Sequence, residues 1–358
     1  MTPRSIPSAF ALDGSCQSVE PLGAGHIHRT FLVTTSCARY VLQQINTNIF
    51  PDEAALMGNV DRVSRHLRDM PDVETFRVVP TRDGELFLRD DESNSWRMLT
   101  FIDETCCHDT VPDAESAAGA AALFARFHRA LADLPPPPLN EILRNFHHTP
   151  SRFIQFLEAH EEAPRERLES AASEINFALK QGIEGCSVLQ DLLDTGRIPL
   201  RVAHNDTKIN NVLFDRHTGA ARAVIDLDTV MPGLWLHDVG DLIRTAATRA
   251  AEDEQDLERV RIDPALLRAI LRGYTEAMGD TLLLVERQLL VTAGRVICFE
   301  TGLRFLADHL RGDRYFAVHR PGHNLDRCRT QFQLTRDLVQ YEGSFSAPAS
   351  SSAPDSGA

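Results

Sequence analysis

Alternation of apolar and polar residues dominates the first hundred residues of the chain. Residues 18–35 form two such runs around a glycine-containing turn, and 39–46 is a third strand-forming run. Residues 51–69 differ, because their apolar positions recur at helical spacing after an N-terminal proline and acidic residues. Three further runs are predicted as strands, 74–81, 84–90 and 95–103. The pattern predicts an antiparallel sheet with one helix inserted after the third strand.

Helical periodicity takes over after Asp103. The alanine-rich segment 112–134 is amphipathic, and four prolines at 135–138 end it. Residues 199–229 interrupt the helical pattern with short strand-like runs, and the Ser-, Ala- and Pro-rich tail 344–358 is predicted to be disordered. The other helical segments are 151–160, 165–180, 236–258, 264–278 and 282–311.

The order of these elements predicts a two-lobed α+β fold. A chain of 358 residues is longer than most single cores. We therefore divide it into a β-rich lobe, 1–103, and a helical lobe, 104–343, with a connector near 101–106. Such a layout is typical of proteins whose ligand site lies in a cleft between lobes.

Composition narrows the possible partners and compartment. Hydrophobic residues make up 43% and charged residues 25%, as in ordinary soluble proteins, and the formal net charge is -14. This negative charge argues against nucleic acid and anionic membranes as partners. Neither a signal peptide nor a continuous apolar span is evident, so we expect a cytoplasmic protein. The seven cysteines, an odd number without a CxxC motif, are expected to be reduced and mostly buried.

The segment RVAHNDTKINNVLFD, residues 201–215, places a run of polar residues between two apolar stretches. The apolar runs on either side of a turn at Gly219 predict a hairpin, and its open ends bring Asn211 and Asp226 together. An amide oxygen beside a carboxylate oxygen suits Mg²⁺. Asp206 precedes the hairpin, where it can accept a proton from a hydroxyl held against a metal-bound phosphate.

The spacing H-x-D-x-K-x-x-N matches the catalytic loop of protein kinases, with His204, Asp206, Lys208 and Asn211 at the four positions. Together with AVIDLDTVMPG and HDVGDLIR, this segment resembles the aminoglycoside-phosphotransferase-like kinase superfamily. The resemblance implies a protein-kinase-like fold, ATP as co-substrate and Mg²⁺ as cofactor. The plain alternative is a hairpin with polar ends, which leaves the match of two motifs unexplained.

A narrower resemblance extends over roughly residues 10–340. The segments that carry it, besides RVAHNDTKINNVLFD and AVIDLDTVMPG, are GAGHIHRTFLV, RYVLQQINTNIFPD, GLRFLADHLRGDRYF and HNLDRCRTQFQL. They resemble the bacterial N-acetylhexosamine 1-kinases. That family implies ATP-dependent phosphorylation of the anomeric hydroxyl of N-acetylglucosamine or N-acetylgalactosamine, a phosphotransfer to an alcohol group that serves amino sugar salvage. Two alternatives stay open: a related kinase for choline, homoserine, fructosamine or an aminoglycoside, and a non-catalytic nucleotide or sugar sensor.

The motif residues receive different predicted roles. Asp206 is the catalytic base, and Lys208 is a positive charge for the transferring phosphate. Asn211 and Asp226 are the metal ligands. Asp228, expected on the same strand face as Asp226, either binds a second Mg²⁺ or supports the loop. The residues expected to support the loop structurally are His204, Asn210, Asp238 and Asp241.

The nucleotide is expected between the first turn and the connector. Gly23 and Gly25 allow the backbone to approach the ATP phosphates and donate N–H groups. The third strand departs from protein kinases, because Gln43 and Gln44 stand where a phosphate-gripping lysine is expected. We expect Gln43 to face the cleft, since strand faces alternate. The connector residues expected at the adenine are Phe101, Ile102 and Glu104.

The sugar is expected to contact the helical lobe. Glu300, Arg304 and Asp308 follow one another at a spacing of four residues and therefore share a helix face. Arg304 is the main candidate, as a donor to the sugar hydroxyls or the N-acetyl carbonyl, with Asp308 and Glu300 beside it. His147 and Arg152 are further candidates.

Overall fold

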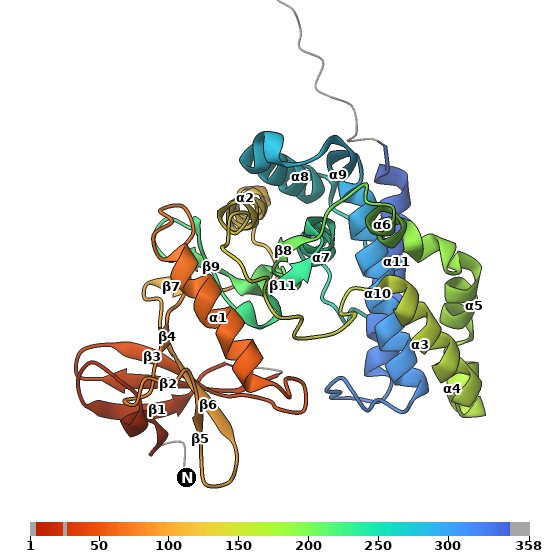
Figure 1. Cartoon of the computed structure of the whole chain (residues 1–358). Helices are drawn as coiled ribbons and strands as arrows, with labels where there is room; N and C mark the ends of the chain where they lie inside the picture. Colours follow the sequence, from red (N-terminus) through yellow and green to blue (C-terminus); the bar gives the residue numbers. More distant parts are fainter. Residues whose placement is uncertain (1–4, 24–26, 344–358) are drawn as a thin grey trace, which may run out of the picture. The chain divides into compact units, whose positions relative to one another are not determined.

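The computed structural model describes residues 5–23 and 27–343 (Figure 1). Two sequence predictions lie outside these residues. One is the role of Gly25 in the phosphate turn, and the other is disorder of the tail 344–358.

The predicted antiparallel sheet with one inserted helix is confirmed. Its strand order is β1-β2-β3-β6-β4, with β5 also paired to β6. The helix α1, Glu53–Leu67, follows the third strand, as expected. The two runs predicted as 74–81 and 84–90 form much shorter strands, since β4 and β5 have two residues each. The strands are β1 Cys16–Pro21, β2 Arg29–Thr35, β3 Arg39–Gln44, β4 Val78–Val79, β5 Leu88–Arg89 and β6 Ser95–Thr100.

The two faces of this sheet have different neighbours. Leu42, Trp96 and Met98 lie in an apolar cluster that also contains Ile6 and Phe10 from the N-terminal segment. Because strand residues alternate between faces, Gln43 and Arg97 project from the opposite face of β3 and β6, where they are directly paired across the strands. The odd-numbered residues of β3 and β6 therefore project from the face that carries Gln43 and Arg97.

The predicted hairpin after the polar loop is also confirmed. Strand β9, Val212–Asp215, pairs with β10, Ala221–Val224, and β7, Thr105–Cys106, adds to the outer side of β9. Strand β8, Arg201–Ala203, pairs with β11, Met231–Gly233. The polar residues 204–211 thus run between β8 and β9, and each end of this stretch is fixed by a different small sheet.

The described chain divides into two compact units. The first consists of Met1–His148, Leu200–Asp238 and Arg268–Gly279, and it contains the large sheet, both small sheets and helix α2, Ala114–Ala130. The second consists of Thr149–Pro199, Val239–Leu267 and Asp280–Ala358. The predicted lobe boundary at residue 103 cuts the chain once, between strand-rich and helical sequence, whereas each of these units combines three segments of the chain. The lobe boundary therefore stays a prediction.

The second unit is a helical assembly around α10, Leu290–Leu310. Helix α11, His323–Leu338, and helix α3, Thr149–Glu162, pack along it (Figure 1). Their core holds Phe299 and Phe332, and Gly302 permits the close packing, because a Cβ there would lie 2.4 Å from the Phe332 ring. The other helices are α4 Arg165–Ser170, α5 Ala172–Gln181, α6 Glu184–Asp194 and α9 Leu284–Gln288.

Several sequence predictions about elements are corrected. The helix predicted over 236–258 is α7, Trp235–Ala246, and it ends twelve residues earlier than predicted. The segment 165–180 is divided at Ala171, and α6 and α11 were not predicted. Helix α8, Pro264–Met278, has the predicted bounds.

The expectation of mostly buried cysteines is wrong for the described residues. Only Cys298 and Cys328 are buried there, and all six described cysteines are free thiols. In the described part of the chain, we find no helix with the length and apolar character needed to cross a membrane.

Candidate active site

The loop between β8 and β9 rests on Asp238 of α7. One carboxylate oxygen of Asp238 accepts the His204 N–H at 2.7 Å, and the other accepts the Asn205 N–H at 2.7 Å. His128 lies 2.6 Å from the same carboxylate. Burial opposes ionisation of Asp238, but the His128 contact keeps its pKa below the usual range. The predicted support role of Asp238 is confirmed, whereas Asp241 accepts a hydrogen bond from Arg244 of the same helix.

His204 links this loop to the segment that carries Asp226. Its Nδ1 accepts the Asp206 N–H at 3.3 Å, so Nε2 carries the proton and donates to the Ile225 carbonyl at 3.0 Å. The side chain is fully buried and packs against Phe124 and Phe127. The predicted structural role of His204 is therefore confirmed: the imidazole joins the backbone of Asp206 to the residue before Asp226.

Three of the motif residues meet at the Asp206 carboxylate. Lys208 Nζ lies 2.9 Å from Oδ1, and Asn211 Nδ2 donates to Oδ2 at 3.0 Å and to the Asp206 carbonyl at 2.7 Å. Asn211 is buried at the end of a 3-10 turn, Ile209–Asn211, while Asn210 is exposed. The spacing D-x-K-x-x-N thus brings all three functional groups into one hydrogen-bonded set.

Asp226 follows the hairpin in a left-handed backbone conformation, with φ of 59°. The Ile225 N–H donates to the Asn211 carbonyl at 3.0 Å, so the open ends of the hairpin meet as predicted. The expectation of one strand face shared by Asp226 and Asp228 is wrong, because Leu227–Thr229 forms a 3-10 turn. Burial, with Asp228 and Asp206 nearby, raises the pKa of Asp226 to about 7.

Asp228 is held by two residues that were not among the predicted site residues. Arg97 donates from Nη1 to Oδ1 and from Nη2 to Oδ2, the latter at 2.8 Å, and His28 Nε2 lies 2.6 Å from Oδ2. All three side chains are buried. Burial opposes ionisation, but the Arg97 charge and the His28 contact hold the pKa of Asp228 well below its usual range. One available signal was an arginine within the otherwise apolar run WRML.

The donor set at the hairpin suits a magnesium ion. In the described part of the chain, no group of three or more His, Cys, Asp and Glu side chains is arranged to hold a metal by itself. Mg²⁺ needs fewer protein ligands than such a group provides, because it commonly binds one or two carboxylates and fills its other coordination positions with phosphate and water oxygens. Asn211 and Asp226 offer an amide and a carboxylate oxygen of this kind. A cation there would also offset the mutual repulsion of Asp226, Asp228 and Asp206.

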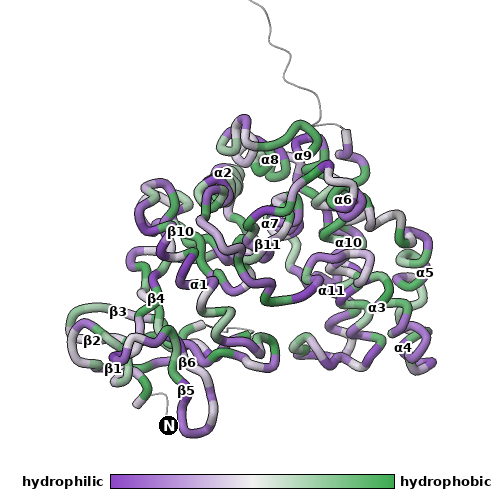
Figure 2. Tube along the Cα trace, in the orientation of Figure 1, coloured by the Kyte–Doolittle hydropathy of each residue, from purple (hydrophilic) through white to green (hydrophobic). Residues whose placement is uncertain are grey.

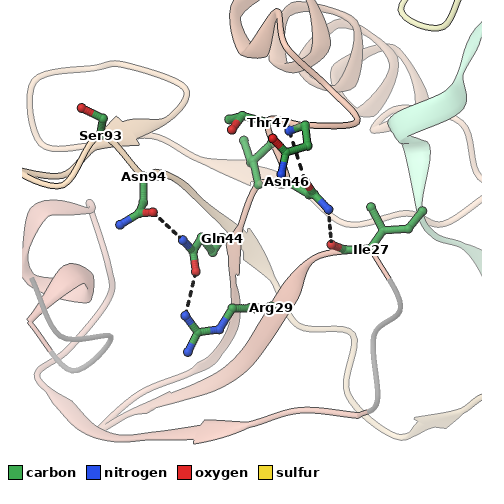
Figure 3. Close-up of a pocket in the computed structure, with 9 residues that line it drawn as sticks. Ile27, Arg29, Gln44, Asn46, Thr47, Ser93 and Asn94 are labelled. Atoms are coloured by element: carbon green, nitrogen blue, oxygen red, sulfur yellow. Dashed lines mark hydrogen bonds between the residues drawn. The ribbon is translucent and has the colours of Figure 1, made fainter. Parts of the chain in front are cut away.

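The two glutamines of β3 project from opposite faces of the sheet. Gln43 Oε1 accepts from Arg97 Nε at 2.9 Å, and Gln43 Nε2 donates to Thr30 at 3.2 Å. Gln44 instead accepts from Arg29 at 3.1 Å and donates to Asn94 at 2.8 Å (Figure 3). The face of Gln43 is therefore the one from which Arg97 reaches Asp228.

Gln44 lines a separate polar pocket of about 290 Å³ (Figure 3). Amide and hydroxyl side chains dominate its lining, and part of it comes from the hydrophilic turn between β5 and β6 (Figure 2). The lining residues are Ile27, Arg29, Gln44, Ile45, Asn46, Thr47, Asn48, Ser93 and Asn94. None of the residues predicted for catalysis or metal binding belongs to it.

The predicted connector lies directly after β6. The Phe101 N–H donates to the Arg39 carbonyl at 3.2 Å, and the Ile102 carbonyl accepts from the Thr105 hydroxyl at 2.8 Å. Glu104 is left-handed, with φ of 57°, and its carbonyl accepts the Arg216 N–H at 2.9 Å. The last of these bonds attaches the connector to the hairpin of the catalytic motif, since Arg216 follows β9.

The predicted sugar residues fall into different units. Arg152, Arg304 and Asp308 belong to the second unit, and His147 belongs to the first. His147 Nε2 lies 2.9 Å from the Asn205 carbonyl. This contact puts His147 beside the backbone that precedes Asp206.

Within the second unit, the Asp308 carboxylate organises a turn. It accepts N–H groups of Arg314, Tyr315 and Phe316, each at 2.9 Å, and Asn324 Nδ2 at 2.9 Å. The Arg304 guanidinium lies over the Phe316 ring, 5.6 Å from its centre. By holding this turn, Asp308 positions Phe316, the residue whose ring contacts the Arg304 guanidinium.

Arg152 belongs to the same group of charges. Burial lowers the pKa of Arg152, the Arg304 charge lowers it further, and Glu300 counteracts both. Glu300 is fully buried and accepts a hydrogen bond from Thr149. The second unit therefore carries two neighbouring arginines beside one buried carboxylate.

The antiparallel sheet with its inserted helix, the helical remainder and the paired motifs define a kinase-like phosphotransferase. Residues 18–281, more than half of the chain, match the phosphotransferase enzyme family, and the chain belongs to that family.

Solved structures agree with this fold at low sequence identity. An aminoglycoside phosphotransferase from Alicyclobacillus acidocaldarius is similar with a TM-score of 0.61 and 15% identity, covering 96% of this chain and 95% of that one. A microcompartment-associated aminopropanol kinase has a TM-score of 0.62 and 14% identity, with 96% and 98% covered. Choline kinase LicA from Streptococcus pneumoniae has a TM-score of 0.56 and 15% identity, with 94% and 97% covered.

Proposed function

We propose that this phosphotransferase moves the γ-phosphate of ATP to the C1 hydroxyl of N-acetylglucosamine or N-acetylgalactosamine. The observation that supports a hydroxyl acceptor is the Asp206 carboxylate, held by Asn211 and Lys208 and joined through His204 to Ile225, which precedes Asp226. The sugar class rests on the resemblance of the sequence motifs to N-acetylhexosamine 1-kinases.

In this proposal Asp206 orients the C1 hydroxyl and accepts its proton. An anomeric hydroxyl is more acidic than an ordinary alcohol, so moderate assistance from a carboxylate is enough. Phosphoryl transfer has a loose transition state, and most of the rate comes from positioning and charge stabilisation. Lys208 supplies a positive charge to the transferring phosphate from the same loop.

Asn211 and Asp226 would hold the magnesium ion. When bound, the ion neutralises phosphate charge and aligns the terminal phosphate with the acceptor. Of the two roles left open for Asp228, support of the loop fits its contacts with Arg97 and His28 better than direct coordination.

The nucleotide is proposed to bind on the face of the large sheet that carries Gln43. Backbone groups around Gly23 would meet the phosphates, and adenine would meet the connector. The proposed connector residues are Phe101, Ile102 and Glu104.

Arg304 and Arg152 are proposed to bind the sugar, and Asp308 would act indirectly by holding the turn at Tyr315 and Phe316. Two arginines suit the hydroxyl and carbonyl oxygens of an N-acetylated sugar. They would repel a quaternary or primary ammonium group in the same place.

A second candidate is a kinase for a small amino alcohol such as choline. It is favoured by the likeness to a choline kinase and an aminopropanol kinase, although that likeness concerns the fold. A cationic acceptor would need carboxylates around it. The arginine pair of the second unit is the feature that supports a neutral sugar over a cationic acceptor in this proposal.

An acceptor panel tests the proposal. ADP release from MgATP is measured with N-acetylglucosamine, N-acetylgalactosamine, glucose, choline, homoserine, a fructosamine and an aminoglycoside. We expect acceptor-dependent ADP release only with the two N-acetylhexosamines. Release with choline or another cationic acceptor alone would overturn the sugar assignment, and no release with any acceptor would favour a nucleotide sensor.

A further inference from the structure

Arg97 is a buried cation on the face of the sheet that carries Gln43. Its relative exposure is 2%, and it lies in the middle of β6, between Trp96 and Met98. Protein kinases place a lysine on the third strand for the ATP phosphates. Here the third strand has Gln43, which pairs with Arg97 across β3 and β6 and accepts a hydrogen bond from its Nε. The positive charge therefore comes from the neighbouring strand.

The Arg97 guanidinium uses its two terminal nitrogens on Asp228. This is a two-pronged contact in which each Nη meets a different carboxylate oxygen. Arginine stays charged when buried, and loss of either partner would leave an uncompensated buried charge. The pair therefore attaches the 3-10 turn that contains Asp228 rigidly to β6, unlike a surface ion pair, whose side chains can rearrange.

His28 makes a second connection to the same carboxylate. The Asn46 N–H donates to His28 Nδ1 at 3.1 Å, so Nε2 carries the proton that is donated to Asp228. The imidazole also stacks on Phe50, with ring centres 5.5 Å apart. Since His28 directly precedes β2, Asp228 joins β6 and the start of β2 to one turn.

That turn begins directly after Asp226, the proposed metal ligand. Asp226 is left-handed, and Asp228 lies within the Leu227–Thr229 turn that follows it. A short turn leaves little freedom between two residues so close, so the anchor at Asp228 restricts where the Asp226 carboxylate lies. Asn59 Nδ2 fixes the far side of the turn by donating to the Val230 carbonyl at 3.2 Å.

We propose that Arg97 is a positioning residue for metal binding, which acts on Asp226 through Asp228 and takes the place of the third-strand lysine in organising this site. Asp228 is then committed to Arg97 and His28 instead of a second ion. The inference rests on the proposed phosphotransferase function, but not on the identity of the acceptor.

Metal binding without any acceptor tests this inference. Mn²⁺ is titrated into the protein with saturating ADP, and free Mn²⁺ is followed by electron paramagnetic resonance. We expect Arg97→Met to weaken Mn²⁺ binding by about tenfold or more, in line with the loss of a metal site's supporting contact. Arg97→Lys, which keeps the charge but loses the two-pronged contact, should have an intermediate effect. The control Arg77→Met, at an exposed arginine next to β4, should bind as the wild type does.

Two further measurements separate positioning from general damage. The affinity for ADP without metal should change by less than about twofold, because Arg97 acts on the metal ligand. Asp228→Asn should weaken Mn²⁺ binding as Arg97→Met does, and the double variant should be no worse than either, as expected for residues that act as a unit.

The double variant also removes both buried charges, so it is informative if Arg97→Met alone fails to fold. Folded Arg97→Lys and double variants with wild-type Mn²⁺ affinity would overturn the inference, as would fully additive effects in the folded single and double variants. If the wild type binds Mn²⁺ with ADP but phosphorylates no N-acetylhexosamine, the proposed acceptor is refuted. The role of Arg97 would be unaffected by that result. A wild type that binds no Mn²⁺ with ADP would refute both.

Discussion

The catalytic loop and the third strand of the sheet follow the kinase pattern to different degrees. In the loop, His204, Asp206, Lys208 and Asn211 keep the expected spacing, and their side chains contact one another or the adjoining backbone. In the strand the expected lysine is missing, and the nearby positive charge is Arg97 of another strand. The comparison indicates that functional residues close together in the sequence can be recognised from their spacing. A charged residue that a different strand contributes to the same site cannot be recognised in this way.

The loop around Asp206 also has more side-chain support than Gln43 of the third strand. Asp238 accepts two of its backbone N–H groups, and the Asn205 side chain bonds to the Thr229 carbonyl at 3.0 Å. Gly233 permits this packing, because a Cβ there would lie 2.4 Å from Asn205 Oδ1. Gln43, by contrast, has one contact with Arg97 and one with Thr30. In the proposed function the loop carries the groups that meet the acceptor and the phosphate, whereas Gln43 acts through Arg97. Substitutions should therefore affect catalysis most in the loop and least on the strand.

The largest effect is expected for Asp206→Asn. We expect kcat to fall by at least about a hundredfold, the usual lower range for loss of a general base. Asparagine keeps the shape and can still accept a hydrogen bond from either Lys208 or Asn211 through its remaining oxygen, so ADP and sugar binding should persist. Steady-state kinetics and calorimetric binding measure the two quantities. A kcat close to that of the wild type would remove Asp206 from its assigned role.

An intermediate effect is expected for Lys208→Ala. We expect kcat to fall by about tenfold with little change in KM for the sugar, since the charge acts on the transferring phosphate. The effect should be smaller than for a buried donor, because the Lys208 side chain is 40% exposed and solvent screens its charge. Lys208→Arg is the matched control, and it should recover part of the rate. A normal rate for Lys208→Ala would refute the phosphate contact.

The smallest effects are expected on the third strand, and they test which face is used. Gln43→Leu should raise KM for ATP by about threefold, because Arg97 loses a partner beside the proposed metal site. Gln44→Leu should leave KM for ATP unchanged, since its contacts are with Arg29 and Asn94 on the other face. Initial rates at varied MgATP give both values. A larger effect at Gln44 than at Gln43 would reverse the assignment of the faces.

The part of the site that could be predicted is the part encoded locally. The hairpin follows from two apolar runs and the turn at Gly219, and the meeting of Asn211 with the segment of Asp226 follows from the hairpin. The left-handed backbone of Asp226 could not be predicted, because the alternating pattern continued through Asp228 and indicated a strand.

The remaining misses have a common physical cause, which is dependence on distant residues. Arg97 and His28 meet Asp228 across sequence separations of 131 and 200 residues, so no local pattern connects them. Helices α6 and α11 pack on α3, α5 and α10, and such tertiary packing stabilises helices whose own signal is weak. The short strands β4 and β5 are limited by their pairing with β6 rather than by their own residues.

The position of the transferred phosphate tests the account most directly. The product formed from ATP and N-acetylglucosamine is examined by phosphorus and proton nuclear magnetic resonance. The account predicts a phosphate coupled to the H1 proton, with loss of the reducing end, and no product from the 1-deoxy sugar. Phosphate on C6, or phosphorylation of choline in place of the sugar, would contradict it.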